Sequence, residues 1–217
     1  MDKDGQVDEE LQLFISEWGQ PTQRILASEE DLSELSGYVP AILIAYWREV
    51  GFSVFKSGLM LLTNPLEWQE TVDEWLEGTE LESLDRFIPL MRGAFGDFRL
   101  FGLNKGHTAT LMVSDGAYMG RRDQPDYTMD ISIKGEFVCC DPGRFDLSDH
   151  SPNFADALKK LGPLHPNEMY GFVPVLPLGG TRDLEHLQKL DAFAHLSILR
   201  QATGPLRGVM EYADIYR

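Results

Sequence analysis

Residues 97–118 decide the fold class, and they read DFRLFGLNKGHTATLMVSDGAY. Apolar residues occupy every second position in two parts of this stretch. These positions are Phe98, Leu100, Ala109, Leu111 and Val113. Alternation with a period of two is typical of strands that bury one face and expose the other. Turn sequences at 104–106 and 115–116 lie beside the two parts, so the stretch predicts antiparallel hairpins.

Two flanking stretches extend the predicted sheet. Residues 129–133 alternate apolar and polar side chains in the same way, so we expect a further strand there. Residues 52–55 and 59–63 read as two short strands around a turn at 56–58. The sheet is therefore expected to consist of short antiparallel strands with one solvated face.

Helical periodicity appears on both sides of this region. Apolar residues recur with helical spacing in residues 11–18 and 39–50, and again in residues 154–161. Residues 183–203 are expected to form a last long helix, or two helices in series. The pattern places helices before and after the strands, as in α+β proteins.

The extended stretch at 170–178 contains Pro174 and Pro177, which a central strand does not tolerate, so we expect an edge strand or a loop. The predicted fold class is α+β, with a curved antiparallel sheet and helices at the N- and C-terminal ends. Four large aromatic side chains are expected to be buried. They are Trp47, Trp68, Trp75 and Phe95.

The helix expected after Asn64 is sharply defined. Asn64 is a favourable N-cap, Pro65 suits the first helical turn, and Gly78 ends the pattern. Its apolar stripe consists of Trp68, Val72, Trp75 and Leu76. Its other faces carry Glu67, Glu70, Asp73, Glu74 and Glu77. Several of these carboxylates are like charges four residues apart, which destabilises an isolated helix by a few tenths of a kcal/mol per pair. Helix stability alone does not explain why acidic residues occupy these positions.

Length and composition exclude several classes of protein. A chain of 217 residues with 43% hydrophobic and 11% aromatic residues can form a sizeable core and is not a disordered protein. No stretch approaches the ~20 apolar residues of a membrane span, and the acidic N-terminus does not resemble a secretory signal. The two cysteines are neighbours, Cys139 and Cys140, which is typical of a reducing compartment. We expect a cytoplasmic protein.

The charge is strongly acidic and unevenly distributed. The formal net charge is −16, and residues 1–90 account for 19 acidic against 5 basic side chains. Such a chain is a poor ligand for nucleic acid or an anionic membrane surface, because both are bound through Lys and Arg. The charge favours a basic protein partner, and an ordinary solvated surface is the alternative. We take Glu67, Glu70, Asp73, Glu74 and Glu77 as the candidate partner-binding residues.

Candidate catalytic residues form no coherent group. On a continuous helix, His186 and His195 would lie about 180° apart, so they could not share a metal ion. In a strand, Cys139 and Cys140 would point to opposite faces. The turn at 179–182 could hold an anion if a helix begins there, but a turn with Thr181 as N-cap is the better interpretation. No catalytic residue, metal or cofactor is expected.

Six short segments in a fixed order carry a family resemblance. Residues 39–76 read Val-Pro-x5-Tyr-Trp-x3-Gly-Phe, then Ser-Gly-Leu and Thr-Asn-Pro-x2-Trp, and end in Trp-Leu. Ala-Phe-Gly-Asp follows at 94–97 and Glu-Met-Tyr-Gly-Phe-Val-Pro at 168–174, then Leu-Gly-Gly at 178–180 and His-Leu at 195–196. In this order the chain resembles the GAD-like family of bacterial immunity proteins.

The resemblance implies a function and no catalytic residues. Members of that family are typically encoded beside type VI secretion effectors, several of which are DNases, and each member binds and blocks its cognate toxin. The resemblance therefore implies a non-enzymatic protein that neutralises a cognate type VI secretion toxin by stoichiometric occlusion, and we expect this toxin to be a DNase. An acidic adaptor or chaperone-like module for a basic protein is the alternative, and an enzyme using the turn at 179–182 is the third.

The change in charge along the chain also suggests a division. Residues 1–85 form an acidic, mainly helical N-terminal part, and residues 86–217 form a strand-rich middle with a helical C-terminal part. No Pro- or Ser-rich linker separates them, so one continuous domain is the alternative.

Overall fold

A computed structural model describes residues 8–123, 127–146 and 152–210 of the chain. These ranges contain eight α-helices and nine strands. The helices are α1 (Glu9–Trp18), α2 (Glu29–Leu35), α3 (Ala41–Val50), α4 (Pro65–Leu76), α5 (Glu80–Leu84), α6 (Met129–Val138), α7 (Phe154–Leu161) and α8 (Ala192–Ala202). The strands are β1 (Val54–Phe55), β2 (Met60–Leu62), β3 (Phe87–Gly93), β4 (Phe98–Gly102), β5 (Thr108–Met112), β6 (Ala117–Met119), β7 (Glu168–Phe172), β8 (Leu187–Asp191) and β9 (Arg207–Val209).

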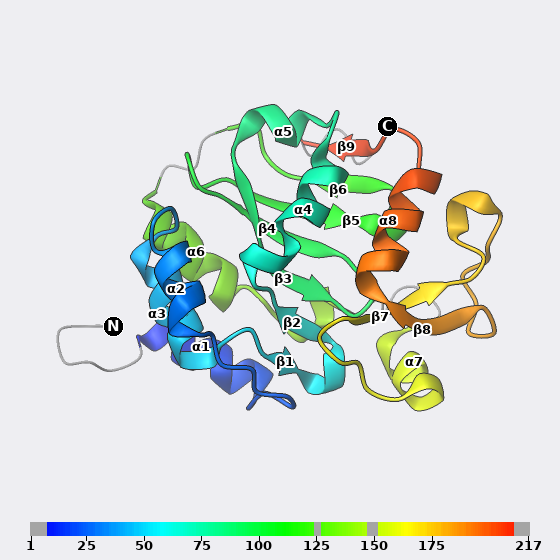
Figure 1. The fold of residues 1–217 in the computed structure, drawn as a ribbon, viewed down its shortest axis with the longest axis horizontal. Helices are drawn as coiled ribbons and strands as arrows, with labels where there is room; N and C mark the ends of the chain where they lie inside the picture. The colour runs from blue at the N-terminus through cyan, green and yellow to red at the C-terminus, as the bar shows by residue number, and fades with distance from the viewer. Residues whose placement is uncertain (1–7, 124–126, 147–151, 211–217) are drawn as a thin grey trace.

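Seven strands form one sheet in the order β1-β2-β3-β4-β5-β6-β9, and β7 pairs with β8 in a separate hairpin. Successive strands from β1 to β6 pair antiparallel with one another, and Phe98 of β4 lies opposite Leu111 of β5. After α8 the chain returns beside β6 as the parallel strand β9, so the sheet is mixed. The predicted α+β class, with hairpins at 97–118 and helices at both ends, is confirmed (Figure 1).

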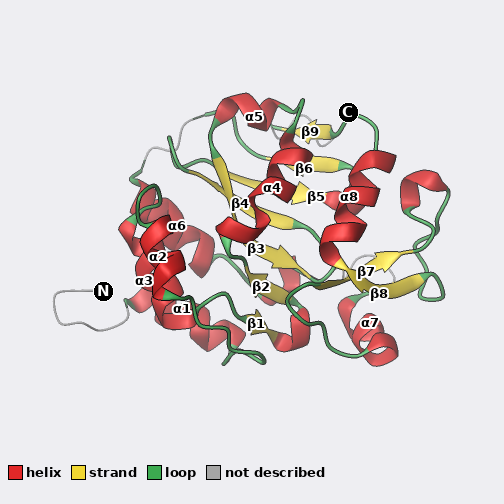
Figure 2. Cartoon of the chain, in the orientation of Figure 1, coloured by secondary structure: helices red, strands yellow, loops and turns green. Residues whose placement is uncertain are grey.

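The helices cover the sheet unequally. Helices α4 and α8 lie side by side across one face, whereas α1, α2, α3 and α6 gather at one end of the molecule (Figures 1 and 2). The cluster under α4 and α8 includes Phe98, Leu100 and Leu111, the inward positions of the alternating strands. The four aromatic side chains predicted to be buried, Trp47, Trp68, Trp75 and Phe95, are all at most 4% exposed.

The predicted strand at 129–133 is wrong, because these residues begin helix α6. Thr128 caps the helix by accepting a hydrogen bond from the Ile131 backbone N–H. Ile133 and Phe137, four residues apart, are buried, while Ile131 is 55% exposed. Five alternating residues were too short a sample to separate a strand from a capped helix.

The predicted helix at 183–203 is correct only in its second half. Residues Leu187–Asp191 form β8 and pair with β7, and α8 begins after Asp191, whose side chain accepts a hydrogen bond from the Ala194 N–H at 2.8 Å. Because no continuous helix joins them, the angular argument for His186 and His195 does not apply. Thr181 precedes no helix, so its predicted role as an N-cap is also wrong.

The division predicted at residue 85 falls between α5 and β3, and it stays a prediction. Strand β2 from the first part pairs with β3 from the second, with Leu61 opposite Arg92. Within the described ranges, none of the helices combines the length and the apolar character that a membrane span requires.

Candidate functional site

Helix α4 is fixed to the sheet by the residues that the sequence singled out. The Asn64 side chain accepts a hydrogen bond from the Leu66 N–H at 3.0 Å, and Pro65 occupies the first turn. The apolar stripe of Trp68, Val72, Trp75 and Leu76 is buried. This anchoring determines which side of α4 faces solvent.

Four acidic residues of α4 and its C-cap residue Glu77 occupy the outer side of the helix, and we call these five the acidic face of α4. Glu67, Glu70, Asp73 and Glu77 are exposed, and Glu74 is half-buried. In the part of the chain that the structure describes, none of these five carboxylates forms a salt bridge; Asp73 accepts a hydrogen bond from the Gln69 amide. The structure thus brings the predicted residues together on one surface, and their carboxylates form no salt bridges with the described residues.

An arginine beside the acidic face binds backbone carbonyl groups. Arg200 of α8 donates from Nε to the Glu74 carbonyl oxygen at 3.1 Å and from Nη2 to the Glu77 carbonyl oxygen at 3.4 Å. These carbonyls lie in the last turn of α4, where the helix dipole favours a cation. Arg200 therefore stabilises the end of the helix through the backbone and, in the described structure, forms no salt bridge with the Glu74 or Glu77 carboxylate.

A polar groove of about 500 Å³ adjoins the acidic face. Asp73 belongs to both, and the groove is also lined by Glu82, Arg86 and Lys105. The guanidinium of Arg86 lies 5.1 Å from the centre of the Tyr38 ring. The groove mixes both signs of charge, so the acidic character is strongest on the outer side of α4.

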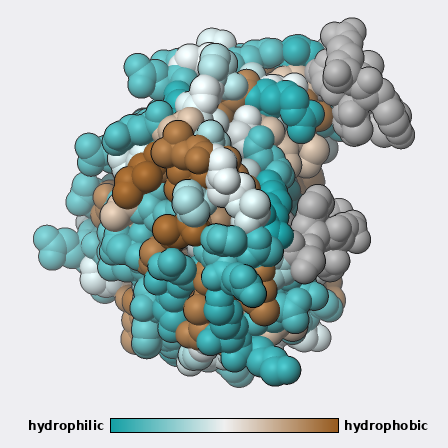
Figure 3. Space-filling view, turned by 90° about the vertical axis from the view of Figure 1, so that its right-hand side faces the viewer, coloured by the Kyte–Doolittle hydropathy of each residue, from teal (hydrophilic) through white to brown (hydrophobic). Residues whose placement is uncertain are grey.

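An exposed apolar area lies on the loop between β7 and β8. Leu178 is 68% exposed, and Val173 and Leu184 on the same loop are also solvent-accessible. Figure 3 faces this side of the molecule and shows hydrophobic side chains gathered among hydrophilic ones. Exposed apolar areas with a polar surround are a common feature of protein–protein interfaces.

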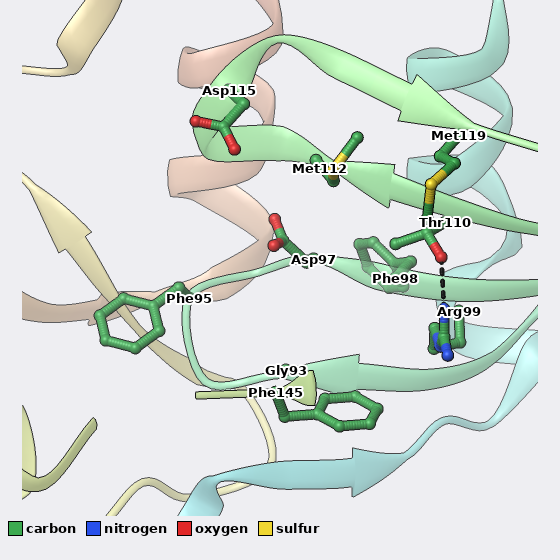
Figure 4. A pocket seen from close by; sticks show the side chains of 10 residues that line it. All are labelled: Gly93, Phe95, Asp97, Phe98, Arg99, Thr110, Met112, Asp115, Met119 and Phe145. Atoms are coloured by element: carbon green, nitrogen blue, oxygen red, sulfur yellow. Dashed lines mark hydrogen bonds between the residues drawn. The ribbon is translucent and has the colours of Figure 1, made fainter. Parts of the chain in front are cut away.

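A separate cavity of about 520 Å³ lies beside the β4-β5-β6 hairpins (Figure 4). Asp97 and Asp115 lie at one end, and Arg99 lies with Thr110 at the other. The Arg99 Nη1 donates to the Thr110 hydroxyl at 2.6 Å, and Arg99 also pairs with Glu136 at 4.0 Å. Asp97 belongs to the Ala-Phe-Gly-Asp segment at 94–97, but no local pattern indicates this cavity, because its walls come from separate strands.

The cysteines do not form a reactive pair. Cys139 is exposed at the end of α6, and Cys140 is buried with its Sγ 3.2 Å from the Met91 sulfur. Burial raises the pKa of Cys140 to about 12, which disfavours the nucleophilic thiolate. In the described residues, no group of three or more His, Cys, Asp or Glu side chains is arranged to hold a metal ion.

The surroundings of His195, His186 and the turn at 179–182 are also typical of residues with a structural role. His195 is buried beside Gly171, next to a void of only about 10 Å³. Burial lowers the pKa of His195. His186 pairs with Asp183 at 2.6 Å, and Arg182 pairs with Asp115. In the turn at 179–182, Arg182 therefore forms an ion pair, and no helix of the described structure begins at this turn.

Comparisons with known proteins match both halves of the chain. The family model for the GAD-like domain matches residues 9–115, and the model for the C-terminal part of the T6SS immunity protein Tdi1 matches residues 139–203. No curated protein matches the chain. The crystal structure of Atu4351 from Agrobacterium tumefaciens is similar with a TM-score of 0.79 at 22% identity, over 93% of this chain and 94% of that chain. At that identity the structural similarity establishes a shared fold. The two family matches, in order and over most of the sequence, show that the chain belongs to the GAD-like family of type VI secretion immunity proteins.

Proposed function

We propose that this immunity protein neutralises a DNase toxin by binding its basic DNA groove with the acidic face of α4. The observation that carries the proposal is the outward row of carboxylates without a cationic partner in the described structure. A DNA groove is basic because it binds phosphates, and carboxylates can occupy the same positions through charge-assisted hydrogen bonds. Stoichiometric occlusion of the groove would then prevent DNA binding.

The arrangement of charges on α4 supports such a partner. Glu70 and Glu74 are four residues apart on the helix, and Asp73 lies four residues before the C-cap residue Glu77. Their mutual repulsion is a small penalty in the free protein, and a basic surface would relieve it on binding. The uneven net charge of the chain would also accelerate the encounter with a basic toxin.

The proposal includes where and how the protein acts. A DNase damages DNA in the cytoplasm, so we propose that the immunity protein meets it there. Its action is binding without catalysis, and it makes no direct contact with nucleic acid because its charge is repelled by phosphates.

Reversing two charges of the acidic face tests the proposal. We expect Glu70→Lys combined with Glu74→Lys to slow association with the toxin about tenfold at low salt and to reduce its salt dependence. Peripheral charges act mainly on the association rate, because they steer the encounter. Surface plasmon resonance against a catalytically inactive toxin at two ionic strengths measures both quantities.

The matched control carries the same change in net charge on other helices. Glu17→Lys with Glu49→Lys alters two exposed residues of α1 and α3. The control should retain most of the association rate. Equal rates and equal salt slopes for the folded α4 variant and the wild type would exclude the acidic face as the contact surface.

A second set of variants tests the absence of catalysis. Cys139→Ala combined with His186→Ala should leave protection of toxin-expressing cells unchanged, because neither side chain belongs to a catalytic group in the described structure. Cys140→Ala and His195→Ala remove buried side chains and should lower the free energy of unfolding by about 1–3 kcal/mol without abolishing protection. Loss of protection by a variant that circular dichroism shows to be folded would support an enzymatic mechanism instead.

A further inference from the structure

The cavity of about 520 Å³ combines an apolar wall with charged ends. The side chains Phe95, Phe98, Met112, Met119 and Phe145 supply its apolar lining. Met119 is 42% exposed at the rim, and Phe145 is buried. Figure 4 shows the carboxylates of Asp97 and Asp115 together at one end of this space. A volume of this size is typical of sites for small organic molecules.

The charges at the carboxylate end do not cancel. Asp97 is half-buried, and its Oδ1 accepts a hydrogen bond from the Val113 N–H at 2.9 Å. Asp115 is neutralised by its ion pair with Arg182, which also donates to the Ser114 carbonyl oxygen. When it is ionised, Asp97 therefore carries a negative charge for which the described residues supply no salt-bridge partner.

The opposite end of the cavity is close to neutral. Arg99 is held by the Thr110 hydroxyl and by Glu136. Arg99 lies in β4 and Asp97 lies in the turn before β4, so their side chains lie at different points along the same wall of the cavity. A ligand would therefore meet a negative head site and, beyond it, an apolar stem site.

We propose that this cavity binds an organic cation, an ammonium or guanidinium group on an apolar stem, with its charged head at the Asp97 carboxylate. The stem lies against the methionine and phenylalanine side chains, where each methylene leaves water. The cationic head supplies a counterion to the Asp97 carboxylate through a charge-assisted hydrogen bond. This site is distinct from the acidic face of α4, and the proposal does not depend on the identity of the toxin.

The protonation of Asp97 fits this role. Burial raises its pKa to about 7, and the charge of Asp115 acts in the same direction. Hydrogen bonds from the Val113 and Ser114 N–H groups and the charge of Arg182 act in the opposite direction. An entering cation favours the ionised carboxylate, so binding should release a proton near neutral pH.

The direct test uses n-butylguanidinium and unsubstituted guanidinium as probes, titrated into the toxin-free protein by NMR and calorimetry. We expect saturable binding of n-butylguanidinium that is at least about tenfold tighter than that of guanidinium, because only the former has a stem to bury. Chemical-shift changes should map to Thr110, Met112 and Met119, which line the cavity.

Two isosteric variants separate the cavity from the general acidity of the protein. Asp97→Asn keeps an oxygen for the Val113 N–H and should weaken n-butylguanidinium binding at least about tenfold. Asp73→Asn removes the same charge from the acidic face of α4 and should bind the probe like the wild type. Equal affinity in wild type and Asp97→Asn, or failure of the wild type to saturate, would overturn the proposal.

The pH dependence provides an independent readout. With a pKa of about 7, about a tenth of the Asp97 carboxylates are ionised at pH 6 and about nine tenths at pH 8. The guanidinium probe does not titrate in this range. Apparent affinity should therefore rise about tenfold from pH 6 to pH 8 in the wild type and stay constant in Asp97→Asn. A flat wild-type profile would contradict the assignment of the head site to Asp97.

The same chemistry can be supplied by a free amine or by a lysine or arginine side chain of the toxin. Measuring the affinity of Asp97→Asn for inactive toxin distinguishes these sources once probe binding is established. A loss of about tenfold or more identifies a toxin side chain, and unchanged toxin affinity identifies a free organic cation. If the toxin fails to bind even the wild type, the proposed function fails while the probe titrations still decide this site.

Discussion

Replacing Arg92 by alanine is expected to lower the free energy of unfolding by about 3–5 kcal/mol, a large part of the stability of an ordinary domain. Arg92 lies in β3 and is fully buried. Its Nη2 donates to the carbonyl oxygens of Pro166 at 2.8 Å and Glu168 at 3.0 Å. The variant would leave both acceptors without this donor and open a space in the core.

Arg92 also contacts the buried side of α4, opposite the acidic face. Its guanidinium lies 4.7 Å from the centre of the Trp68 ring, and Trp68 stacks on Phe193 of α8 at 4.0 Å with an interplanar angle of 16°. Trp68 is one of the residues that anchor α4. Loss of Arg92 should therefore loosen α4, α8 and the β7-β8 hairpin together, so we also expect weaker toxin protection at growth temperature.

The charge of Arg92 is not the main source of this stability. Burial lowers its pKa to about 9, with the charge of Asp191 acting in the opposite direction, and Nε and Nη1 have no hydrogen-bond partner among the described residues. Arg92→Met keeps an apolar stem against Trp68, so it should cost only about half as much as Arg92→Ala. Urea unfolding of the three proteins measures the difference. An alanine variant as stable as the wild type would show that the buried arginine is dispensable.

Arg92 also illustrates what the sequence could not reveal. Helix α4 is predictable because cap, apolar stripe and terminator agree within one segment, and α1 and α3 are predictable from the helical spacing of their apolar residues. The contact of Arg92 with Pro166 and Glu168 joins residues more than seventy positions apart. A lone arginine in an apolar strand carries no local signal of its partner.

The incorrect predictions have the same origin. In β8, pairing with β7 fixes residues that a local pattern had assigned to the following helix. In α6, packing of Phe137 against Phe14 at 5.2 Å selects the helical face over the alternating one. Tertiary contacts override weak local preference where a segment is short.

The candidate site was predictable in part. Clustering of the four carboxylates on α4 follows from helical spacing alone, since the buried stripe fixes the outward side, and Glu77 follows directly at the C-cap. Whether a toxin contacts them stays a prediction. The cavity at Asp97 was not predictable, because it requires the turn before β4, the turn after β5 and the segment around Phe145 to meet in space.

Replacing Asp85 by alanine is the second change for which we expect a loss of about 3–5 kcal/mol. Asp85 is buried between α5 and β3 and accepts hydrogen bonds from four groups within 3.1 Å. These donors are the backbone N–H groups of Arg86, Asn104 and Lys105 and the Nδ1 of His107. Asp85→Ala would leave the turn between β4 and β5 without its organising acceptor.

The surroundings of Asp85 leave little room for rearrangement. A Cβ atom at Gly102 would lie 2.2 Å from the Asp85 carboxylate, so the strand and the carboxylate are already in close approach. Asn104 and Lys105 also line the groove beside the acidic face of α4. Loss of Asp85 should therefore disorder that wall of the groove as well as lower stability.

Asp85→Asn removes the charge of the side chain but keeps its shape. The effect of this substitution on the free energy of unfolding should therefore depend on pH. Burial acts to raise the pKa of Asp85, but its hydrogen bonds outweigh burial and hold the pKa below the ordinary value. A depressed carboxyl pKa contributes stability that is complete above the unfolded pKa of about 3.9 and is lost as pH falls through the folded pKa.

We expect the asparagine variant to be less stable than the wild type by about 1.5–3 kcal/mol at pH 7. That difference should shrink below pH 4 in urea unfolding experiments, because the wild-type carboxyl then becomes neutral too. A difference that stays constant between pH 7 and pH 3 would mean that the carboxylate charge contributes nothing and that Asp85 acts by shape alone.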